Sequence, residues 1–498
     1  MAGGRLAIRA SVPALAWRRH VVPIVVWPTL VMLTVYVALY VQFAAQLATF
    51  PFDLDQGEGY DAWSGWLINL GQLPYSNNTT YPYYSSNYPP LWSYLVSIPM
   101  AWLGPGLGPA RLISTLAGLG SAGLLGMAAR RASGSTIAAV FAAGFFLASP
   151  YVFHTTPLAR VNSTALLAAV LGLTLLEQPT RTRVVLGSLA FSAALFTKQT
   201  TIDAVLAGVV WLALRQWRMA IVAGSIVGSI GLTGLGALTV LTGGAFWLNV
   251  VSGNANPFDG QQLVGYLTNF GLVHCVLLAT AAAEALRMVR RRALSPWLLY
   301  FMTASIAALG AAKWGAGESY FLGAIAAACV LASCWLARAL DASSVQTRLA
   351  VAAALLLQTL LLAHGTVSDL ATWLPDRGPQ SALLGHAPTD DDRLAANELT
   401  QQLRRQTNPV LAEEASFAVV AGHDVVGNAT HLRNLHQAGL WNPSSLVGDL
   451  QARRYAIVVL NAELYPEPVL AAIGRFYFLD RTVRINRATY HVFLPGSD

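Results

Sequence analysis

The sequence contains few charged residues and few cysteines. Charged side chains make up 11% of its 498 residues, and only three residues are cysteine. Cys275, Cys329 and Cys334 lie in apolar runs without Cys-x-x-Cys spacing, which argues against a disulfide framework and a zinc site. The net charge of +7 is carried mostly by short loops. That distribution suits membrane orientation, so no nucleic-acid partner is expected.

Apolar residues, by contrast, are abundant and come in long runs. They make up 55% of the chain, and its mean hydropathy is +0.50. The runs are about 17 to 25 residues long, the length of helix that crosses a bilayer. They predict an α-helical polytopic membrane protein of about eleven spans. The runs lie near 21–46, 108–129, 135–152, 161–177, 183–197, 201–214, 219–247, 266–286, 295–312, 317–337 and 349–367.

Arginine clusters predict how these spans are oriented. Short loops rich in basic residues are usually cytoplasmic. If the N-terminus is cytoplasmic, every cluster falls on that side, and an odd number of spans places the tail outside. Counting 90–104 as a span would reverse the later clusters, so we expect a re-entrant or interfacial helix there, or a bent first part of the second span. The clusters are Arg5–Arg19, Arg130-Arg131, Arg181/Arg183, Arg215/Arg218, Arg287 with Arg290–Arg292, and Arg338/Arg348.

The composition changes near residue 368, which predicts two domains. Residues 1–367 would form the membrane domain, with 47–89 as its first outer loop. Residues 368–498 would form a small extracytoplasmic α/β or α+β domain, because a helical pattern is followed by strand-length apolar segments. Its histidines lack metal-ligand spacing and are interpreted as surface or core residues. The stretch 432–450 could lie over a membrane cavity and meet an acceptor.

Unusual polar residues collect in the predicted outer loops, which are 47–89, 153–160, 198–200, 248–265 and 313–318. Lys198 and Lys313 are the only lysines of the chain, and each follows an apolar run at the outer boundary. Arg160 and Glu318 lie in other outer loops. One such residue could simply anchor a helix end by snorkelling. A set gathered on one face favours a functional site, because ionisable groups at a membrane are costly and usually functional.

The first outer loop holds the densest group of acids. Its segment "DLDQGEGYDAWSG" places Asp53, Asp55, Glu58 and Asp61 within nine positions. Aromatic and apolar residues then recur at helical spacing from Tyr60, which predicts a short helix lying in the membrane interface. Helix capping would explain one acid, but it explains the whole group less well.

The segment 55–95, "DQGEGYDAWSGWLINLGQLPYSNNTTYPYYSSNYPPLWSYL", resembles the first outer loop of integral-membrane glycosyltransferases with the GT-C fold. The resemblance is to bacterial proteins akin to protein mannosyltransferases and aminoarabinose transferases (family 39-like). It rests on an early acid, the Gly71–Tyr75 step and Tyr88-Pro89-Pro90, and continues through "GPARLIS", "FHTTPLARVN", "FTKQT" and "KWGAGESYFL". It therefore covers most of the membrane region.

This resemblance implies transfer of a sugar from a polyprenyl-phosphate donor on the outer face. The acceptor would be a lipid, a glycan or a protein. Asp55 would be the base, with Glu58 close enough to share or replace it. Lys198, Lys313 and Arg160 would bind the donor phosphate. Tyr60, Tyr88, Asn162 and Glu318 would line the substrate groove.

No metal or other cofactor is assigned from the sequence. Relatives often carry Arg-x-Asp where this chain has Arg160-Val161-Asn162, so the carboxylate for a divalent metal bridged between two loops is missing. The resemblance also implies a multi-pass protein of the bacterial inner membrane, surrounded by membrane lipids. A transporter or flippase remains the main alternative, because many apolar spans with scarce charges would suit one. A non-catalytic scaffold would leave the acidic loop unexplained.

Overall fold

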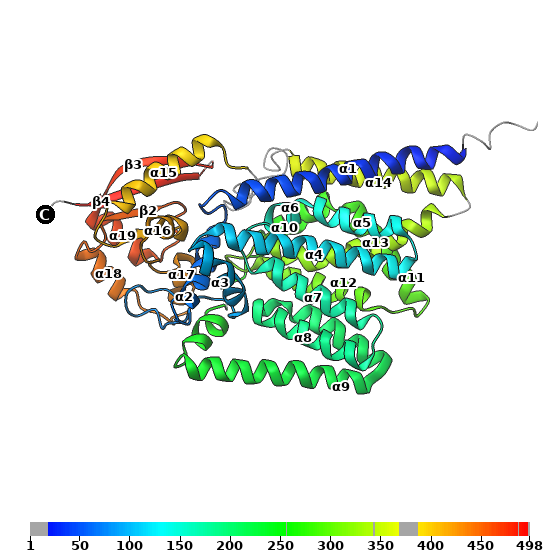
Figure 1. Cartoon of the computed structure of the whole chain (residues 1–498), viewed down its shortest axis with the longest axis horizontal. Helices are drawn as coiled ribbons and strands as arrows, with labels where there is room; N and C mark the ends of the chain where they lie inside the picture. Colours follow the sequence, from blue (N-terminus) through cyan, green and yellow to red (C-terminus); the bar gives the residue numbers. More distant parts are fainter. Residues whose placement is uncertain (1–17, 255, 342–343, 368–386, 487, 497–498) are drawn as a thin grey trace, which may run out of the picture.

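A helical bundle and a smaller region built on a β-sheet lie at opposite ends of the molecule (Figure 1). The structure is a computed structural model that describes residues 18–254, 256–341, 344–367, 387–486 and 488–496. The mostly helical chain with a small C-terminal sheet agrees with the predicted fold class.

The bundle comprises the helices up to residue 367. They are α1 (Arg18–Ala48), α2 (Glu58–Asn69), α3 (Leu91–Leu103), α4 (Leu107–Ser133), α5 (Thr136–Ala148), α6 (Pro150–Thr155), α7 (Asn162–Leu176), α8 (Arg181–Thr197), α9 (Ile202–Leu241), α10 (Gly260–Val273), α11 (Cys275–Arg290), α12 (Pro296–Ala307), α13 (Leu322–Leu340) and α14 (Val345–Val367).

Helix length and composition support only part of the predicted span count. Among the described residues, four helices are long and apolar enough to cross a membrane: Val26–Ala48, Leu107–Ser133, Gln199–Leu241 and Glu318–Leu340. A bent pair, α10 with α11, would make a fifth. Other apolar helices, such as α5 and α7, are shorter. The count of eleven therefore stays a prediction.

The bundle contains two breaks in the course of its helices, one inside α9 and one between α10 and α11. Helix α9 is interrupted at Gln216 (φ −150°, ψ 75°), so its two arms correspond to the predicted runs 201–214 and 219–247. The axes of α10 and α11 meet at 85°. At this break Gln358 of α14 donates to the Val273 carbonyl and accepts from the Leu277 amide, at 2.8 Å each. One side chain thus satisfies two of the backbone groups that the break exposes.

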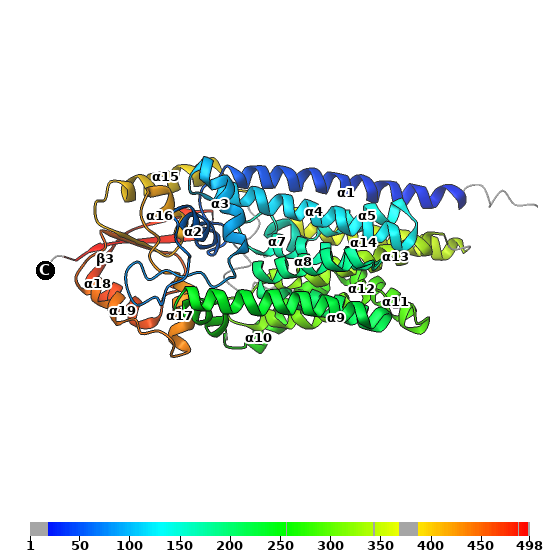
Figure 2. The same cartoon turned by 60° about the horizontal axis from the view of Figure 1, so that its bottom comes forward.

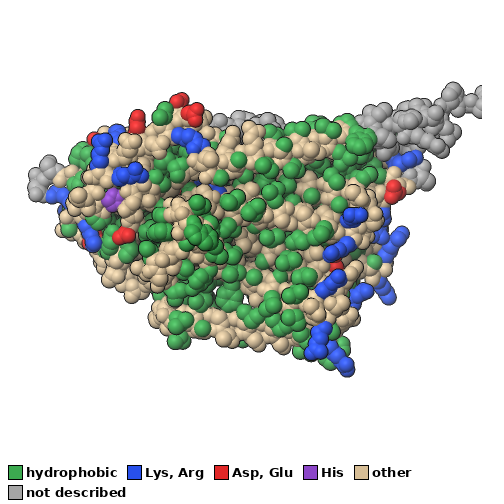
Figure 3. All heavy atoms as spheres, in the orientation of Figure 1, with side chains coloured by type: hydrophobic (Ala, Val, Ile, Leu, Met, Phe, Trp, Pro, Cys, Tyr) green, Lys and Arg blue, Asp and Glu red, His purple; other side chains and the backbone are tan. Residues whose placement is uncertain are grey.

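Basic side chains mark the end of the bundle far from the sheet (Figure 3). Arg130 and Arg131 lie in the last turn of α4, and Arg287 and Arg290 in the last turn of α11. Cations are favourable there because the C-terminal end of a helix carries partial negative charge. The clusters at the ends of α4 and α11 thus share one end of the molecule, and its assignment to the cytoplasm stays a prediction. Most of the Arg5–Arg19 cluster lies outside the described residues.

The C-terminal region is a mixed four-stranded sheet with helices packed around it. The strand order is β1-β2-β4-β3, with β1 parallel to β2 and the other pairs antiparallel. The core of this region is apolar, with Leu411, Val458 and Ile473 fully buried. The elements are α15 (Asp390–Arg404), β1 (Val410–Ala412), α16 (Ala415–Ala421), α17 (Ala429–Gln437), α18 (Ser444–Gln451), β2 (Ile457–Leu460), α19 (Glu467–Phe476), β3 (Tyr477–Ile485) and β4 (Ala488–Pro495).

Helices α2 and α3 pack together where the bundle meets the sheet region (Figure 2). Helix α2 begins at Glu58, within two positions of the predicted helix start at Tyr60. Helix α3 covers the segment 90–104 and is separated from α4 by Gly104–Gly106. Both lie at the end of the bundle where a helix at the membrane interface was expected.

Candidate functional site

A cavity of about 470 Å³ lies between the bundle and the C-terminal region. Its wall is built from the first loop, the segments around 155–162, 198–200 and 313–320, the residues Asn254 and Asn256, and parts of the C-terminal region. These are the loops that the sequence placed on the outer face, together with the tail. The structure therefore brings the predicted outer segments together around one space.

Glu58, predicted as a catalytic partner of Asp55, does not line this cavity. Its side chain is 0% exposed and pairs with Arg111, also 0% exposed. The Arg111 Nε and Nη2 atoms donate to Glu58 Oε1 and Oε2, at 2.7 Å each. Burial raises the pKa of Glu58, but Arg111 and backbone amides outweigh burial and hold that pKa below its ordinary value. Glu58 is thus placed to hold the loop together rather than to contact a substrate.

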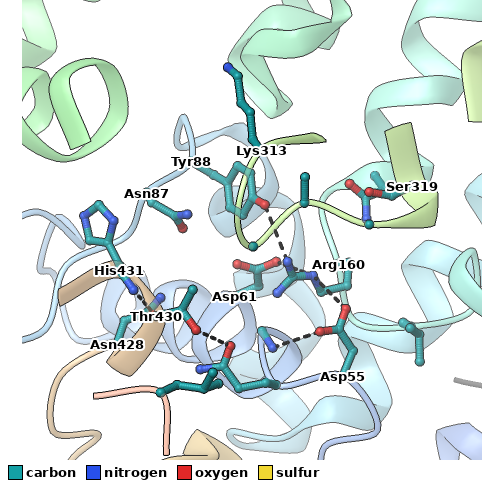
Figure 4. A pocket seen from close by; sticks show the side chains of 18 of the residues that line it. Asp55, Asp61, Asn87, Tyr88, Arg160, Lys313, Ser319, Asn428, Thr430 and His431 are labelled. Atoms are coloured by element: carbon teal, nitrogen blue, oxygen red, sulfur yellow. Dashed lines mark hydrogen bonds and ion pairs between the residues drawn. The ribbon is translucent and has the colours of Figure 1, made fainter. Parts of the chain in front are cut away.

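Asp55, in contrast, faces the cavity and is 35% exposed. Its Oδ2 lies 3.5 Å from Arg160 Nε, and Asp61 Oδ2 lies at the same distance on the other side (Figure 4). Arg160 fits between them because Gly57 has no side chain: a Cβ there would lie 1.1 Å from Arg160 Nη1. The loop backbone is therefore shaped around a guanidinium flanked by two carboxylates.

The two carboxylates differ in environment. Asp61 is 5% exposed, and its Oδ2 has no hydrogen-bond partner in the part of the chain that the structure describes. Burial raises the pKa of Asp61 to about 7, although Arg160 opposes the shift. The carboxylates raise the pKa of Arg160, which keeps its charge. Arg160 thus has one partly exposed partner, Asp55, and one buried partner, Asp61, and both line the cavity.

A second cation joins this group from helix α8. Lys198 is buried, and its Nζ donates to Asn162 Oδ1 at 2.7 Å and lies 4.9 Å from the centre of the Tyr320 ring. Burial and the charge of Arg160 lower the pKa of Lys198 to about 8. Tyr88 completes the group, because its hydroxyl accepts from Arg160 Nη2 at 3.5 Å.

Lys313 and Glu318 also line the cavity, but they are placed differently. The Lys313 side chain extends away from Asp55 and Arg160 (Figure 4). The two lysines predicted to act together are therefore not equivalent. Glu318 begins a short 3-10 helix, Glu318–Phe321, that leads into α13.

Tyr60, predicted to line the substrate groove, is 1% exposed and lies outside the cavity wall. Its hydroxyl donates to the Glu413 carbonyl at 2.7 Å. Nearby, the Asp53 carboxylate accepts from the Ser416 amide at 2.9 Å, and the Asp53 amide donates to Ser416 Oγ at 2.9 Å. Tyr60 and Asp53 thus attach the first loop to the C-terminal region.

Several residues of the cavity wall were not predicted as site residues. Asp61 belongs to the acidic group of the first loop, but no feature of the sequence distinguished it from the other acids of that group. Gln56 and Asn256 are neutral amides with no sequence signal of their own. The C-terminal region contributes Thr430, His431 and Asn434 from helix α17, within or just before the stretch 432–450 that was expected over a cavity. His431 is therefore a buried wall residue.

The arrangement suits an anion next to a general base. Arg160 lies 3.5 Å from the Asp55 carboxylate, which is open to the cavity, and Lys198 lines the same cavity. Among the described residues, no group of three or more His, Cys, Asp or Glu side chains is arranged to hold a metal ion.

Comparison with known proteins agrees with this fold. A model of glycosyltransferase family 87 matches residues 87–311. The matched stretch includes Tyr88, Arg160, Asn162 and Lys198, whereas Asp55 and the C-terminal region lie outside it. The chain has the fold of the GT-C membrane glycosyltransferases, as the sequence led us to expect.

Solved structures resemble the chain over most of its length. The apo crystal structure of ArnT from Cupriavidus metallidurans has a TM-score of 0.63 at 16% identity, covering 92% of this chain and 97% of that one. The same ArnT bound to undecaprenyl phosphate has a TM-score of 0.61 at 15% identity, with the same coverage. The Archaeoglobus fulgidus oligosaccharyltransferase in complex with Zn and sulfate has a TM-score of 0.52 at 14% identity, covering 89% of this chain and 69% of that one. No curated protein matches by sequence.

Proposed function

We propose that the protein is a membrane glycosyltransferase that moves a sugar from a polyprenyl-phosphate donor to an acceptor hydroxyl. The observation that carries this proposal is the cavity in which Asp55 stands open beside Arg160, with Lys198 in the same wall. The match to glycosyltransferase family 87 and the likeness to an ArnT structure bound to undecaprenyl phosphate support it.

Asp55 acts as the general base in this proposal. It takes the proton of the acceptor hydroxyl, whose oxygen then bonds to the anomeric carbon of the donor sugar. The bond from that carbon to the phosphate oxygen breaks, and the electron pair leaves with the lipid phosphate. Asp61 stays beside Arg160 while the guanidinium turns toward the phosphate.

Arg160 and Lys198 bind the phosphate of the donor and stabilise it as it leaves. A guanidinium can contact two phosphate oxygens, and a buried ammonium acts as a compact charge. Asn162 orients Lys198 through its 2.7 Å hydrogen bond. Lys313 takes a lesser part, because its side chain is directed away from this pair (Figure 4). No metal-dependent step is proposed.

The cavity faces the outer side of a bacterial inner membrane in this proposal. Arginine clusters at the opposite end of the bundle support that orientation, because basic loops are usually cytoplasmic. The C-terminal region would then be extracytoplasmic and would close the cavity above the membrane.

Donor cleavage tests the proposal against the transporter alternative. Purified protein in lipid nanodiscs is incubated with a panel of polyprenyl-phosphate sugars, and products are followed by mass spectrometry. A glycosyltransferase releases free polyprenyl phosphate from at least one donor, either by transfer or by slow hydrolysis. Movement of intact donor across the membrane of proteoliposomes, with no cleavage of any donor, would instead establish a transporter or flippase.

Donor affinity is expected to fall as the pH rises through about 8, because Lys198 then loses its charge. Lys198→Ala should weaken donor binding at pH 7 by about tenfold or more and remove most of this pH dependence. Lys198→Arg should restore binding only partly, since a guanidinium does not fit the same hydrogen bond. Binding is measured by titrating nanodiscs with the donor.

Lys313→Ala is the matched control for this experiment. It removes the other lysine of the chain from the same cavity wall, and it should change donor affinity by less than about twofold. Equal affinity losses in both alanine variants would contradict the separate roles given to the two lysines.

A further inference from the structure

The C-terminal region and the loops that face it contribute several neutral polar side chains to the cavity wall, beside two carboxylates, Glu413 and Glu414. We call the neutral wall the part formed by Gln56, Asn256, Thr430, His431 and Asn434. Gln56 and Thr430 are joined by a hydrogen bond of 2.9 Å between Oε1 and Oγ1 (Figure 4). Gly315 lies beside both Thr430 and Asn256, because a Cβ at Gly315 would be 3.5 Å from Thr430 Cγ2 and 4.0 Å from Asn256 Nδ2. Loops distant in the sequence thus meet in one neutral patch.

Most residues of the neutral wall have one polar atom anchored and the other unpartnered. Asn256 Nδ2 donates to the Trp314 carbonyl at 2.8 Å, while its Oδ1 has no partner among the described residues. Gln56 uses Oε1 for Thr430, and its Nε2 is unpartnered within the same ranges. Asn434, 8% exposed, has an unpartnered Oδ1 by the same measure. Buried polar groups without a partner are rare in folded proteins and usually indicate a missing ligand or water.

The hydrogen-bond network fixes the tautomer of His431. Asn249 Nδ2 donates to the carbonyls of Ser76 and Ala245, at 2.7 and 2.8 Å, so Asn249 Oδ1 is an acceptor. That oxygen accepts from Asn78 Nδ2 and lies 2.8 Å from His431 Nε2, which must therefore carry a proton. Burial lowers the pKa of His431 to about 4, so the ring is neutral at pH 7. Its Nδ1 is then an unpartnered acceptor within the described chain.

The two carboxylates that line the same part of the cavity, Glu413 and Glu414, already accept hydrogen bonds from the protein. Glu413 accepts from the backbone amides of Asn461 and Ala462 through Oε2, at 2.6 and 2.7 Å, and from Leu464 through Oε1. Glu414 accepts from Asn461 Nδ2 and from Tyr490, at 2.8 and 2.6 Å. Within the described residues, the unpartnered groups of the neutral wall are thus one donor and three neutral acceptors. The donor is Gln56 Nε2, and the acceptors are Asn256 Oδ1, His431 Nδ1 and Asn434 Oδ1. A hydroxyl matches such a set, because it both donates and accepts.

We propose that the neutral wall is the acceptor subsite and that it takes an uncharged, polyhydroxylated group such as a sugar residue. Gln56 follows directly after Asp55, so a ring held by the neutral wall has a hydroxyl beside the base. The ionic residues Arg160 and Lys198 remain available to the donor phosphate. Helix α17 is then the element through which the C-terminal region selects the acceptor. This inference rests on the proposed function.

Acceptor competition and acceptor-side variants test the inference with the donor that the cleavage screen identifies. Nanodiscs receive an uncharged alkyl glycoside panel, the same sugars carrying a phosphate, or a serine-containing and threonine-containing peptide. Transfer to uncharged glycosides is expected to exceed transfer to the other two classes by about tenfold. Preferential transfer to a phosphorylated sugar or to the peptide would overturn the proposal.

Thr430→Val and Asn434→Leu are shape-conserving variants of the neutral wall. Each should raise the KM for the glycoside by about tenfold, while donor hydrolysis without acceptor stays within about twofold of wild type. Asn408→Leu, at an exposed position of the same region, is the matched control and should change neither value. An unchanged KM in both wall variants, or an equal loss of donor hydrolysis, overturns the acceptor subsite. Absence of donor cleavage by wild type would instead mark failure of the proposed function itself.

Two variants of His431 separate its structural contact from its proposed contact with acceptor. His431→Gln retains a donor near Nε2 but lacks the Nδ1 acceptor, so KM should rise while Tm stays near wild type. His431→Asn retains an acceptor near Nδ1 but loses the contact with Asn249, so Tm should fall with a smaller change in KM. A larger rise in KM for His431→Asn than for His431→Gln would show that His431 acts only through Asn249. It would remove His431 from the subsite.

Discussion

Asp55→Asn is expected to lower sugar transfer by about 10²–10⁴-fold, because a positioned general base commonly contributes that much to the rate. The variant should remain folded, since Asp55 is partly exposed and, among the described residues, its carboxylate accepts one hydrogen bond, a 3.2 Å contact with the Gly57 amide. Donor affinity should change little, or increase, as Arg160 loses one competing carboxylate. The measurement is single-turnover transfer in nanodiscs, with donor binding and Tm recorded on the same preparation.

Asp61→Asn is the matched control, because it removes the other carboxylate that lies 3.5 Å from Arg160 Nε. Asp61 is buried, so its loss should affect the placement of Arg160 and hence donor affinity more than the proton transfer. A variant at Asp61 that abolishes turnover while Asp55→Asn remains active would exchange the roles of the two residues. Near-normal turnover in both variants would show that the first loop is structural.

The sequence was sufficient to find the segments that build the cavity. Apolar runs and arginine clusters placed 47–89, 153–160, 198–200, 248–265 and 313–318 on one side, and each of these ranges contributes wall residues. Bilayer thickness and loop charge constrain such segments strongly, and both can be read locally. The existence of a C-terminal sheet could be predicted for the same reason, because strand-length apolar segments are a local pattern.

The sequence could not separate the roles of neighbouring side chains. Asp55 and Glu58 are three positions apart, and only the distant partner Arg111 decides which of them is enclosed. Arg111 lies inside an apolar run, where nothing local relates it to the first loop. Lys198 and Lys313 looked equivalent at two outer boundaries, but Asn162 holds the first and the second is directed away (Figure 4). Pairings of this kind depend on tertiary packing.

The neutral residues of the cavity wall carry no sequence pattern that predicts a site. Gln56, Asn256 and Asn434 are ordinary amides in loops and short helices, and their meaning arises from unpartnered atoms gathered in one wall. Tyr60 was predicted to line the substrate groove, as an aromatic residue in an interfacial helix, but it does not line the cavity. Its hydroxyl instead joins the first loop to the Glu413 carbonyl.

Glu58→Gln is expected to destabilise the protein by about 3–5 kcal/mol, because it leaves the Arg111 charge buried without a counterion. Arg111 also donates through Nη1 to the carbonyls of Leu47 and Phe50, at 2.8 and 2.5 Å, and through Nη2 to that of Phe52, at 2.8 Å. Glu58 in turn accepts from the amides of Leu54 and Ala159, at 2.8 and 2.7 Å. One ion pair thus connects the end of α1, the first loop and the segment before α7.

Activity alone cannot separate this structural role from a catalytic one. Leu54 and Ala159 directly precede Asp55 and Arg160, so loosening the ion pair displaces both sides of the site and lowers turnover as well. Stability distinguishes the two roles: Glu58→Gln should lower Tm strongly, whereas Asp55→Asn should not. A Glu58→Gln protein with wild-type Tm and no turnover would show that Glu58 has a catalytic role.

A double-mutant cycle gives the strictest form of this test. Arg111→Met should be as destabilising as Glu58→Gln, because it leaves the Glu58 carboxylate buried without its cation. The double variant should be less destabilised than the sum of the single variants, since neither charge then remains unpaired. It should not regain wild-type stability, because the carbonyls of Leu47, Phe50 and Phe52 lose their donor. Strict additivity of the two losses in Tm would show that Glu58 and Arg111 act independently.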